Sequence, residues 1–323
     1  MTRSKIQWTD KVWNPVRGCS RVSSGCGGPH GQGGCYAERQ AARFNGPAEP
    51  FQGFVRGHGV DARWTGKVAL IEDKLREPLG WKKPSRVFVN SMSDLFHEAL
   101  PDEAIERVFA VMALASQHTF QILTKRPERM RSWATTERRA ERIGEWMQEM
   151  ALPANGRSYK RFCDRWPLPN VWLGVSVENQ ATADARIPIL LDTPAAVRFA
   201  SYEPALGPVT LTWLRVADGN VDALRGIRHD DFESSGVAPS KDRAKLDWCL
   251  VGGESGPGAR PCDVAWIRSI RDQCKAAGVP CFVKQLGASP MGVFPVPYWR
   301  PIDRKGGDPA EWPSDLRVRE FPA

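Results

Sequence analysis

The sequence of 323 residues contains no apolar run near the length of about 20 residues that a membrane-spanning helix needs. Residues 1–10 are mostly polar and lack the apolar core of a secretory signal peptide. No Walker phosphate loop and no Gly-x-Gly-x-x-Gly fingerprint follows a predicted strand, which argues against a nucleotide-binding doubly wound sheet. These absences predict a cytoplasmic protein without a membrane-embedded part.

The sequence has fewer acidic than basic residues. The chain has 45 Lys and Arg against 37 Asp and Glu, a formal net charge of +8, and it also has 13 Trp. Cationic side chains bind phosphates, and aromatic rings stack on bases. One expectation is therefore a nucleic-acid or nucleobase partner. The other is a solvated basic surface with the tryptophans in the core.

Eight cysteines in a reducing cytoplasm are expected to be metal ligands or small buried hydrophobes rather than disulfides. Cys19, Cys26 and Cys35 lie in a glycine-rich segment whose backbone can fold tightly around a bulky group. Three thiolates can hold three irons of a four-iron cluster and leave the fourth iron open to a substrate or cofactor. Tetrahedral zinc with His30 as the fourth ligand is an alternative, as are thiols without a metal.

The remaining cysteines show no ligand spacing, and Cys249 and Cys281 are predicted to be core residues because they lie within strand patterns. They are Cys163, Cys249, Cys262, Cys274 and Cys281. The other histidines likewise show no ligand spacing and are taken as ordinary. They are His58, His97, His118 and His229.

Strand-like and helical patterns alternate about six times along the chain. The predicted strands are 86–90, 120–124, 171–177, 197–201, 248–252 and 281–285, and the predicted helices are 36–43, 102–117, 127–150, 180–191 and 264–277. Several strands are apolar on both faces, as in a parallel sheet covered by helices. The pattern predicts an α/β fold, a partial or full (β/α) TIM-like barrel.

The predicted barrel spans residues 1–287, with the cysteine loop near its start and a surface insertion near 207–245. Residues 45–66 read as a long loop because they are rich in Gly, Pro and Arg. Residues 288–323 are rich in Pro, Gly and Trp and are expected to pack on the barrel as a tail.

Polar residues follow six of the predicted strands, and catalytic groups of barrels lie at the carboxyl ends of strands. Lys125 and Arg126 could pair with an anion. Glu178, Glu203 and Lys284 could orient a substrate, while Tyr202 could relay a hydrogen atom or stack on a base. The alternative for all of them is the ordinary polarity of loops.

Eleven segments, spread over nearly the whole chain, resemble a phage-encoded three-cysteine family that is related to radical S-adenosylmethionine (SAM) enzymes and is distantly similar to spore photoproduct lyase. They are residues 13–19, 22–26, 35–39, 90–97, 123–127, 172–179, 201–204, 251–256, 284–285, 305–309 and 317–321. The spacing departs from the family, which more often has two residues between the second and third cysteine. Here eight residues, mostly glycine, separate Cys26 from Cys35.

The resemblance implies a barrel of the radical SAM type, a [4Fe-4S] cluster on Cys19, Cys26 and Cys35, and SAM on the open iron. Reductive cleavage of SAM would give a 5'-deoxyadenosyl radical that abstracts a hydrogen atom from the substrate. The residues assigned to cofactor binding are Tyr36, Asn90, Ser91, Ser93, Lys125, Ser176, Glu178, Ser201, Gly252, Gly253 and Glu254. The residues assigned to catalysis are Tyr202, Glu203 and Lys284.

The leading hypothesis is a radical SAM enzyme, encoded by a phage or prophage, that modifies or repairs a nucleobase or DNA. It would take electrons from an external reductant such as flavodoxin or ferredoxin, and a partner protein could take part. A second hypothesis is a non-catalytic DNA-binding protein stabilised by zinc or by a cluster. A third is a radical enzyme that acts on a small molecule or a protein, without salt-sensitive DNA binding.

Overall fold

The computed structural model describes residues 4, 6–28, 32–150, 166–217, 219–229, 244–292 and 301–323. The chain divides into two compact units, each built from segments that are distant in sequence. Unit 1 comprises residues 1–21, 37–174 and 193–197, and unit 2 comprises 22–36, 175–192 and 198–323. Cys19 therefore belongs to unit 1, whereas Cys26 and Cys35 belong to unit 2.

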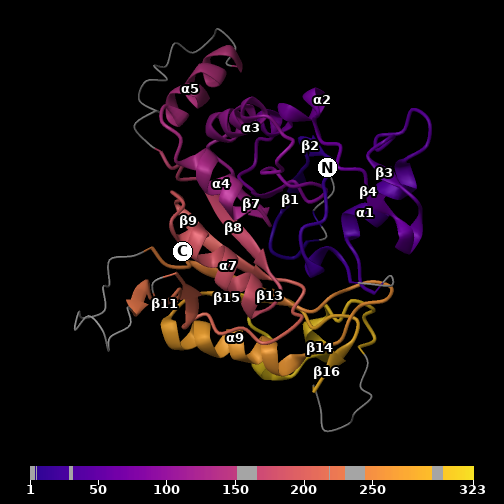
Figure 1. Ribbon diagram of the computed structural model, residues 1–323, viewed down its shortest axis with the longest axis vertical. Helices are drawn as coiled ribbons and strands as arrows, with labels where there is room; N and C mark the ends of the chain where they lie inside the picture. Colours follow the sequence, from indigo (N-terminus) through magenta and orange to yellow (C-terminus); the bar gives the residue numbers. More distant parts are fainter. Residues whose placement is uncertain are drawn as a thin grey trace. The chain divides into compact units, whose positions relative to one another are not determined.

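The main sheet has seven strands in the order β1-β6-β7-β8-β9-β13-β15 (Figure 1). These strands are β1 (Lys11–Trp13), β6 (Arg86–Val89), β7 (Thr119–Thr124), β8 (Val171–Val177), β9 (Val197–Tyr202), β13 (Trp248–Gly252) and β15 (Cys281–Gln285). β6 pairs in parallel with β1 and β7, and β13 pairs in parallel with β9 and β15. The predicted α/β class and the parallel sheet are confirmed, and the topology is compatible with a partial (β/α) barrel.

Helices lie between the strands in sequence, as the alternating pattern predicted. They are α1 (Tyr36–Ala41), α2 (Glu72–Leu75), α3 (Asp102–Leu114), α4 (Pro127–Ala134), α5 (Arg139–Met150), α7 (Gln180–Leu191) and α9 (Val264–Ala277). Asn179 and Thr182 form a capping box at the start of α7, and Gly278 ends α9 in the left-handed conformation. Both bounds of α7 and of α9 agree with the sequence prediction.

The single helix predicted over 127–150 is wrong, because the chain forms α4 and α5 instead. The hydroxyls of Thr135 and Thr136 each donate to a carbonyl four residues earlier, and Arg138 takes a positive φ of 60°. A positive φ cannot continue a right-handed helix, so the chain breaks there. Trp133, Ile143 and Met147, predicted to face inward, are all buried.

The long loop predicted over 45–66 is also wrong in part. It contains an antiparallel hairpin of β3 (Val55–Arg56) and β4 (Arg63–Trp64), in which Val55 and Trp64 are a buried cross-strand pair. Gly57 and Gly59 take positive φ values in the connection, which glycine adopts without steric cost. Abundant glycine therefore marked a turn inside this segment rather than an unstructured loop.

Seven further short strands form small sheets in the described part of the chain. β2 (Val16–Arg17) pairs with β5 (Ala69–Leu70), and β14 (Cys262–Asp263) pairs with β16 (Pro290–Met291). The described part of the region near 207–245 contains a small sheet of β10 (Leu214–Val216), β11 (Gly219–Asp222) and β12 (Ile227–His229). The predicted domain boundary at residue 287 stays a prediction.

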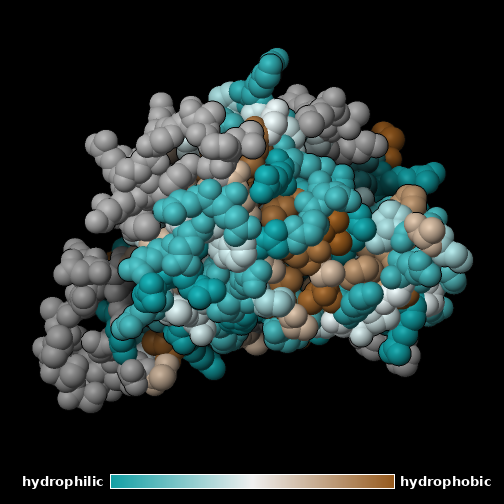
Figure 2. Space-filling view, turned by 90° about the horizontal axis from the view of Figure 1, so that it is seen from above, coloured by the Kyte–Doolittle hydropathy of each residue, from teal (hydrophilic) through white to brown (hydrophobic). Residues whose placement is uncertain are grey.

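Residues 301–323 pack on the rest of unit 2 through buried side chains of Trp312 and Leu316 and through a backbone bridge from Arg319 to Phe282. Among the described residues, no helix has the length and apolarity needed to cross a membrane. Figure 2 shows a largely hydrophilic face with a limited hydrophobic area near its middle.

Candidate functional site

Cys19 follows Gly18, whose φ is +85° and whose missing side chain makes room for the backbone of Lys67. Gly18 also forms a parallel bridge with Ser93, which follows β6. The half-buried Sγ of Cys19 lies 3.9 Å from Nη1 of Arg126, the residue that precedes α4. Unit 1 thus holds Cys19 near the carboxyl ends of β6 and β7.

The buried Arg126 is the centre of an ionic cluster in unit 1. Its guanidinium pairs with Asp94 at 3.1 Å and with Glu98, and it donates to Oγ of Ser20 at 2.7 Å. Burial alone would lower the pKa of Arg126, but the carboxylates of Asp94 and Glu98 outweigh burial and raise the pKa. The anions beside Arg126 are therefore carboxylates of the protein itself.

His97 belongs to the same cluster, although its spacing gave no signal. Its Nε2 lies 2.9 Å from Oγ of Ser20, next to Cys19 in the chain. Burial and the charge of Arg126 lower the pKa of His97, which favours the neutral ring. His97, Asp94 and Glu98 were not assigned a role from the sequence, although His97 and Asp94 lie in the segment 90–97 that carries the resemblance; their position just after β6 was the available signal.

The predicted residues Asn90, Ser91 and Ser93 hold the segment that leads to Cys19. Oδ1 of Asn90 accepts from the backbone N–H of Val16, and Oγ of Ser93 donates to the Val16 carbonyl at 2.8 Å. Oγ of Ser91 donates to Oδ1 of Asn14 at 3.2 Å. Lys125, the fourth residue of unit 1 that was assigned to cofactor binding, donates its backbone N–H to Asp94 at 3.2 Å.

In unit 2 the residue before Cys26 is held against β8. The fully buried Glu178, which follows β8, accepts a hydrogen bond from Oγ of Ser23 at 2.9 Å and pairs with Arg186. A Cβ on Gly25 would overlap the Glu178 carboxylate. The predicted residue Ser176 is buried, and its carbonyl accepts from Arg186 at 2.7 Å.

The residue before Cys35 is held against β13 in the same manner. Gly34 donates its backbone N–H at 3.2 Å to Glu254, which follows β13. Arg260 donates to both carboxylate oxygens of Glu254, at 2.8 and 2.9 Å, and also to the carbonyl of Ser24 at 2.8 Å. Arg260 was not predicted. The Glu254–Arg260 pair forms a clamp on the cysteine loop, because Arg260 contacts it at Ser24 and Glu254 contacts it at Gly34.

Burial would raise the pKa of Glu254, but the hydrogen bonds from Arg260 outweigh burial and lower it. An unfolded carboxyl titrates near 4.5, so this stabilisation is complete above that pH and is lost as the pH falls through the lower folded pKa. As the pH is lowered, we expect the free energy of unfolding to fall less steeply in Glu254→Gln than in the parent. Urea unfolding from about pH 6 to about pH 3 measures this change; an unaltered pH slope would contradict it.

The other predicted residues of unit 2 lie where the backbone of Gly252 and Gly253, at the end of β13, closely approaches the backbone of Gln285 and Leu286. A Cβ on Gly252 would lie 2.9 Å from Oε1 of Glu203, and one on Gly253 would overlap the Leu286 carbonyl. Lys284 pairs with Glu203 at 3.0 Å, and its side chain keeps 28% of its exposure. Oγ of Ser201 donates to Glu203 at 3.3 Å. These contacts place the Glu203–Lys284 pair at the ends of β9 and β15.

Tyr202 and Tyr36 have opposite surroundings. Tyr202 is 2% exposed, and its hydroxyl donates to the Gly207 carbonyl, so burial raises its pKa. Tyr36 is 62% exposed. Tyr202 therefore anchors a turn, whereas the Tyr36 ring faces solvent.

The four other cysteines that the structure describes are buried, as Cys249 and Cys281 were predicted to be. Burial raises the pKa of Cys262 to about 12. Cys163 and His30 lie outside the described residues, and within those residues no group of three His, Cys, Asp or Glu side chains is arranged around a metal position.

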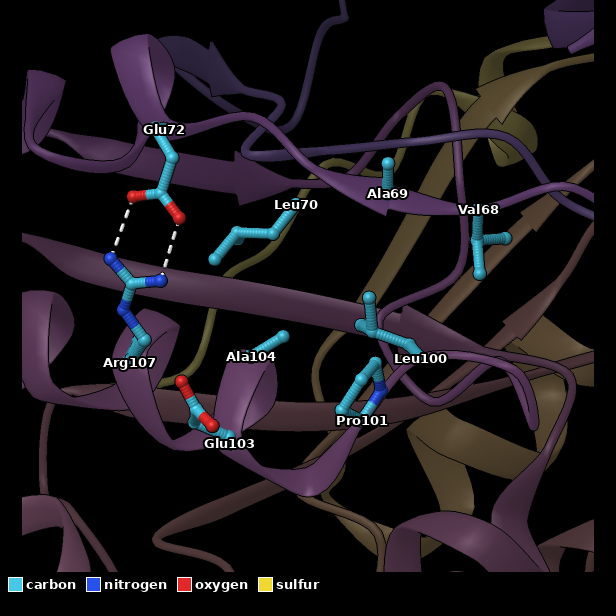
Figure 3. A pocket seen from close by; sticks show the side chains of 9 residues that line it. All are labelled: Val68, Ala69, Leu70, Glu72, Leu100, Pro101, Glu103, Ala104 and Arg107. Atoms are coloured by element: carbon cyan, nitrogen blue, oxygen red, sulfur yellow. Dashed lines mark hydrogen bonds and ion pairs between the residues drawn. The ribbon is translucent and has the colours of Figure 1, made fainter. Parts of the chain in front are cut away.

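Unit 1 also contains a cavity of about 310 Å³ (Figure 3). Its lining is mostly apolar, with Leu70, Leu100 and Pro101 among the side chains, and its rim carries the ion pair of Arg107 with Glu72. None of the predicted site residues lines it.

A family model described as "Protein of unknown function (DUF5131)" matches residues 3–297. No curated protein matches the chain, and neither does any solved structure.

Proposed function

The chain belongs to the family described as Protein of unknown function (DUF5131), and we propose that it is an iron–sulfur enzyme of the radical SAM type acting on a nucleobase or nucleic acid. One observation carries the proposed reaction type. Each of Cys19, Cys26 and Cys35 directly follows a glycine that is held, within its own unit, at the carboxyl end of a strand. Chemistry in (β/α) folds takes place at that end of the strands.

The donor set fits a cluster better than a structural role. The three loop cysteines are half-buried, whereas the other described cysteines are buried in the core. Thiolates are the ligands of iron–sulfur clusters, and their sulfurs accept hydrogen bonds from nearby cations such as Arg126 beside Cys19. Three ligands leave one iron of a four-iron cluster open, which is the position that SAM would take.

When bound, the cluster and SAM would supply a one-electron cleavage that yields a 5'-deoxyadenosyl radical. The chain's own part is to bind and to orient. The clamp of Glu254 and Arg260 fixes the loop around Cys26 and Cys35. The half-exposed ammonium of Lys284 can donate to a substrate carbonyl or phosphate, and Glu203 can accept from a substrate N–H.

The net charge of +8 supports a polyanionic substrate, because cationic side chains that neutralise phosphates release counterions and gain affinity. The substrate class therefore follows from charge, while the reaction type follows from the cysteines. The two parts of the proposal rest on separate observations.

Formation of 5'-deoxyadenosine tests the reaction. Protein purified without oxygen and reconstituted with iron and sulfide is expected to convert SAM to 5'-deoxyadenosine when given dithionite. The product is expected to vanish when any one of Cys19, Cys26 and Cys35 is replaced by alanine. Absence of product, with zinc in the purified protein, would overturn the proposal in favour of a zinc-stabilised nucleic-acid-binding protein.

A further inference from the structure

The β3–β4 hairpin of unit 1 carries like charges directly opposite one another. Arg56 and Arg63 are cross-strand partners. Arg63 donates to the backbone carbonyls of Val60 and Ala62, but neither guanidinium pairs with a carboxylate in the part of the chain that the structure describes. Opposed like charges destabilise a hairpin. An anion bound across the two strands would remove that repulsion.

The segment around the hairpin adds to this positive charge. Residues 37–67 contain five Lys and Arg against three Asp and Glu. One of those acids, Glu38, is buried and already paired with Arg21 at 2.6 Å. Arg43, Arg56 and Lys67 are exposed. The other two acids, Glu49 and Asp61, are exposed, so the exposed side chains of this segment carry a small excess of positive charge.

An aromatic ring stands next to this charge. Phe44 ends a short 3₁₀ helix of residues 42–44, and its side chain is half exposed at 50%. Its carbonyl accepts from the backbone N–H of Phe51, which fixes the Phe44 backbone to the chain leading into the hairpin. Exposed rings beside cations stack on unpaired bases, whereas a duplex hides the faces of its bases.

The hairpin also adjoins Cys19 within unit 1. The backbone of Lys67, three residues beyond β4, fills the space that a side chain on Gly18 would need, and the Phe54 ring borders the same space. Gly18 directly precedes Cys19. A nucleic-acid strand that reaches Lys67 would therefore lie close to Cys19.

We infer that the surface formed by Arg43, Phe44, Arg56, Arg63 and Lys67 binds single-stranded nucleic acid, with the cations on phosphates and Phe44 against a base. This inference rests on the proposed function and extends it by naming the surface that binds the substrate. Its test needs neither SAM nor a reductant.

The test is the anisotropy of a fluorescein-labelled single-stranded oligothymidylate of about 16 nucleotides, titrated with the full chain at several salt concentrations. Replacing Arg56 and Arg63 by glutamine should weaken binding and reduce the slope of log K against log salt by about 1.4, or about 0.7 per charge. Phe44→Ala should weaken binding about tenfold without changing the slope. The Arg56→Gln/Arg63→Gln variant should keep its fold, because the removed repulsion offsets the lost hydrogen bonds of Arg63 and the buried Val55–Trp64 pair stays in place.

Lys82→Gln/Lys83→Gln is the matched control. It removes two exposed charges at the loop before β6, at the strand end opposite Cys19, and should leave the slope almost unchanged. Three results would overturn the inference. They are equal losses of affinity in both double variants, no binding of the oligothymidylate by the parent, or tighter binding of a duplex than of the single strand. Loss confined to the hairpin and Phe44 variants would support the surface even if SAM cleavage were absent, so the two proposals fail separately.

Discussion

The Cys26→Ala variant is expected to lose its iron and all cleavage of SAM. Two remaining thiolates cannot hold a four-iron cluster, so iron should fall from about four per chain to background after reconstitution. Iron and sulfide analysis, together with 5'-deoxyadenosine formation, measures the effect. Unchanged iron content in Cys26→Ala would remove Cys26 from the ligand set.

Cys249→Ala is the control for this experiment. Cys249 is 1% exposed on β13, in the core of unit 2, and a residue so buried is a packing element. Its loss should lower stability modestly and leave the iron content per folded chain unchanged. Loss of iron in both variants would point to a general defect in folding instead of a lost ligand.

Glu254→Ala is expected to produce the second large effect. It leaves the Arg260 guanidinium, whose side chain is only 13% exposed, without a carboxylate and removes the acceptor of the Gly34 N–H. Removing one partner of a buried pair should lower the free energy of unfolding by about 3 kcal/mol. Denaturant unfolding measures the loss, and iron retention after gel filtration should fall with it.

Replacing both partners separates stability from loop anchoring. Glu254→Met/Arg260→Met removes the unpaired charge and should recover most of the unfolding free energy. It cannot restore the acceptor for Gly34 or the donor to the Ser24 carbonyl, so iron retention should stay low. Full recovery of iron in this double variant would show that the clamp acts on stability alone.

Local sequence signals were enough to predict most of the main sheet. The strands 171–177, 248–252 and 281–285 and the helices 180–191 and 264–277 agree with the structure at both ends. Their apolar runs are long, and caps or glycines bound the two helices. The break between α4 and α5 was missed because threonine back-bonding and one positive φ interrupt an otherwise continuous helical pattern.

Apart from the three loop cysteines, most of the candidate site residues were predicted from their position at the end of a strand. Glu178, Glu254 and Lys284 were named by that rule, and the structure gives each of them a charged partner, while their part in a site stays a prediction. Arg260 was missed because its role depends on two contacts at once. One is with the nearby Glu254, and the other is with Ser24, which lies more than 200 residues away from Arg260 in the chain. No spacing within a single segment encodes such a contact.

The two anchors of the cysteine loop have a consequence for its length. Glu178 holds the chain at Ser23 and Gly25, and Glu254 holds it at Gly34, so each cysteine is placed by the residue just before it. Gly33 is held as well, because its backbone N–H donates to the Gly258 carbonyl at 2.7 Å. Insertions and deletions between Gly28 and Gln32 should therefore accumulate among relatives without loss of the cysteines, whereas a side chain on Gly25 or Gly33 would overlap the carboxylate of Glu178 or Glu254.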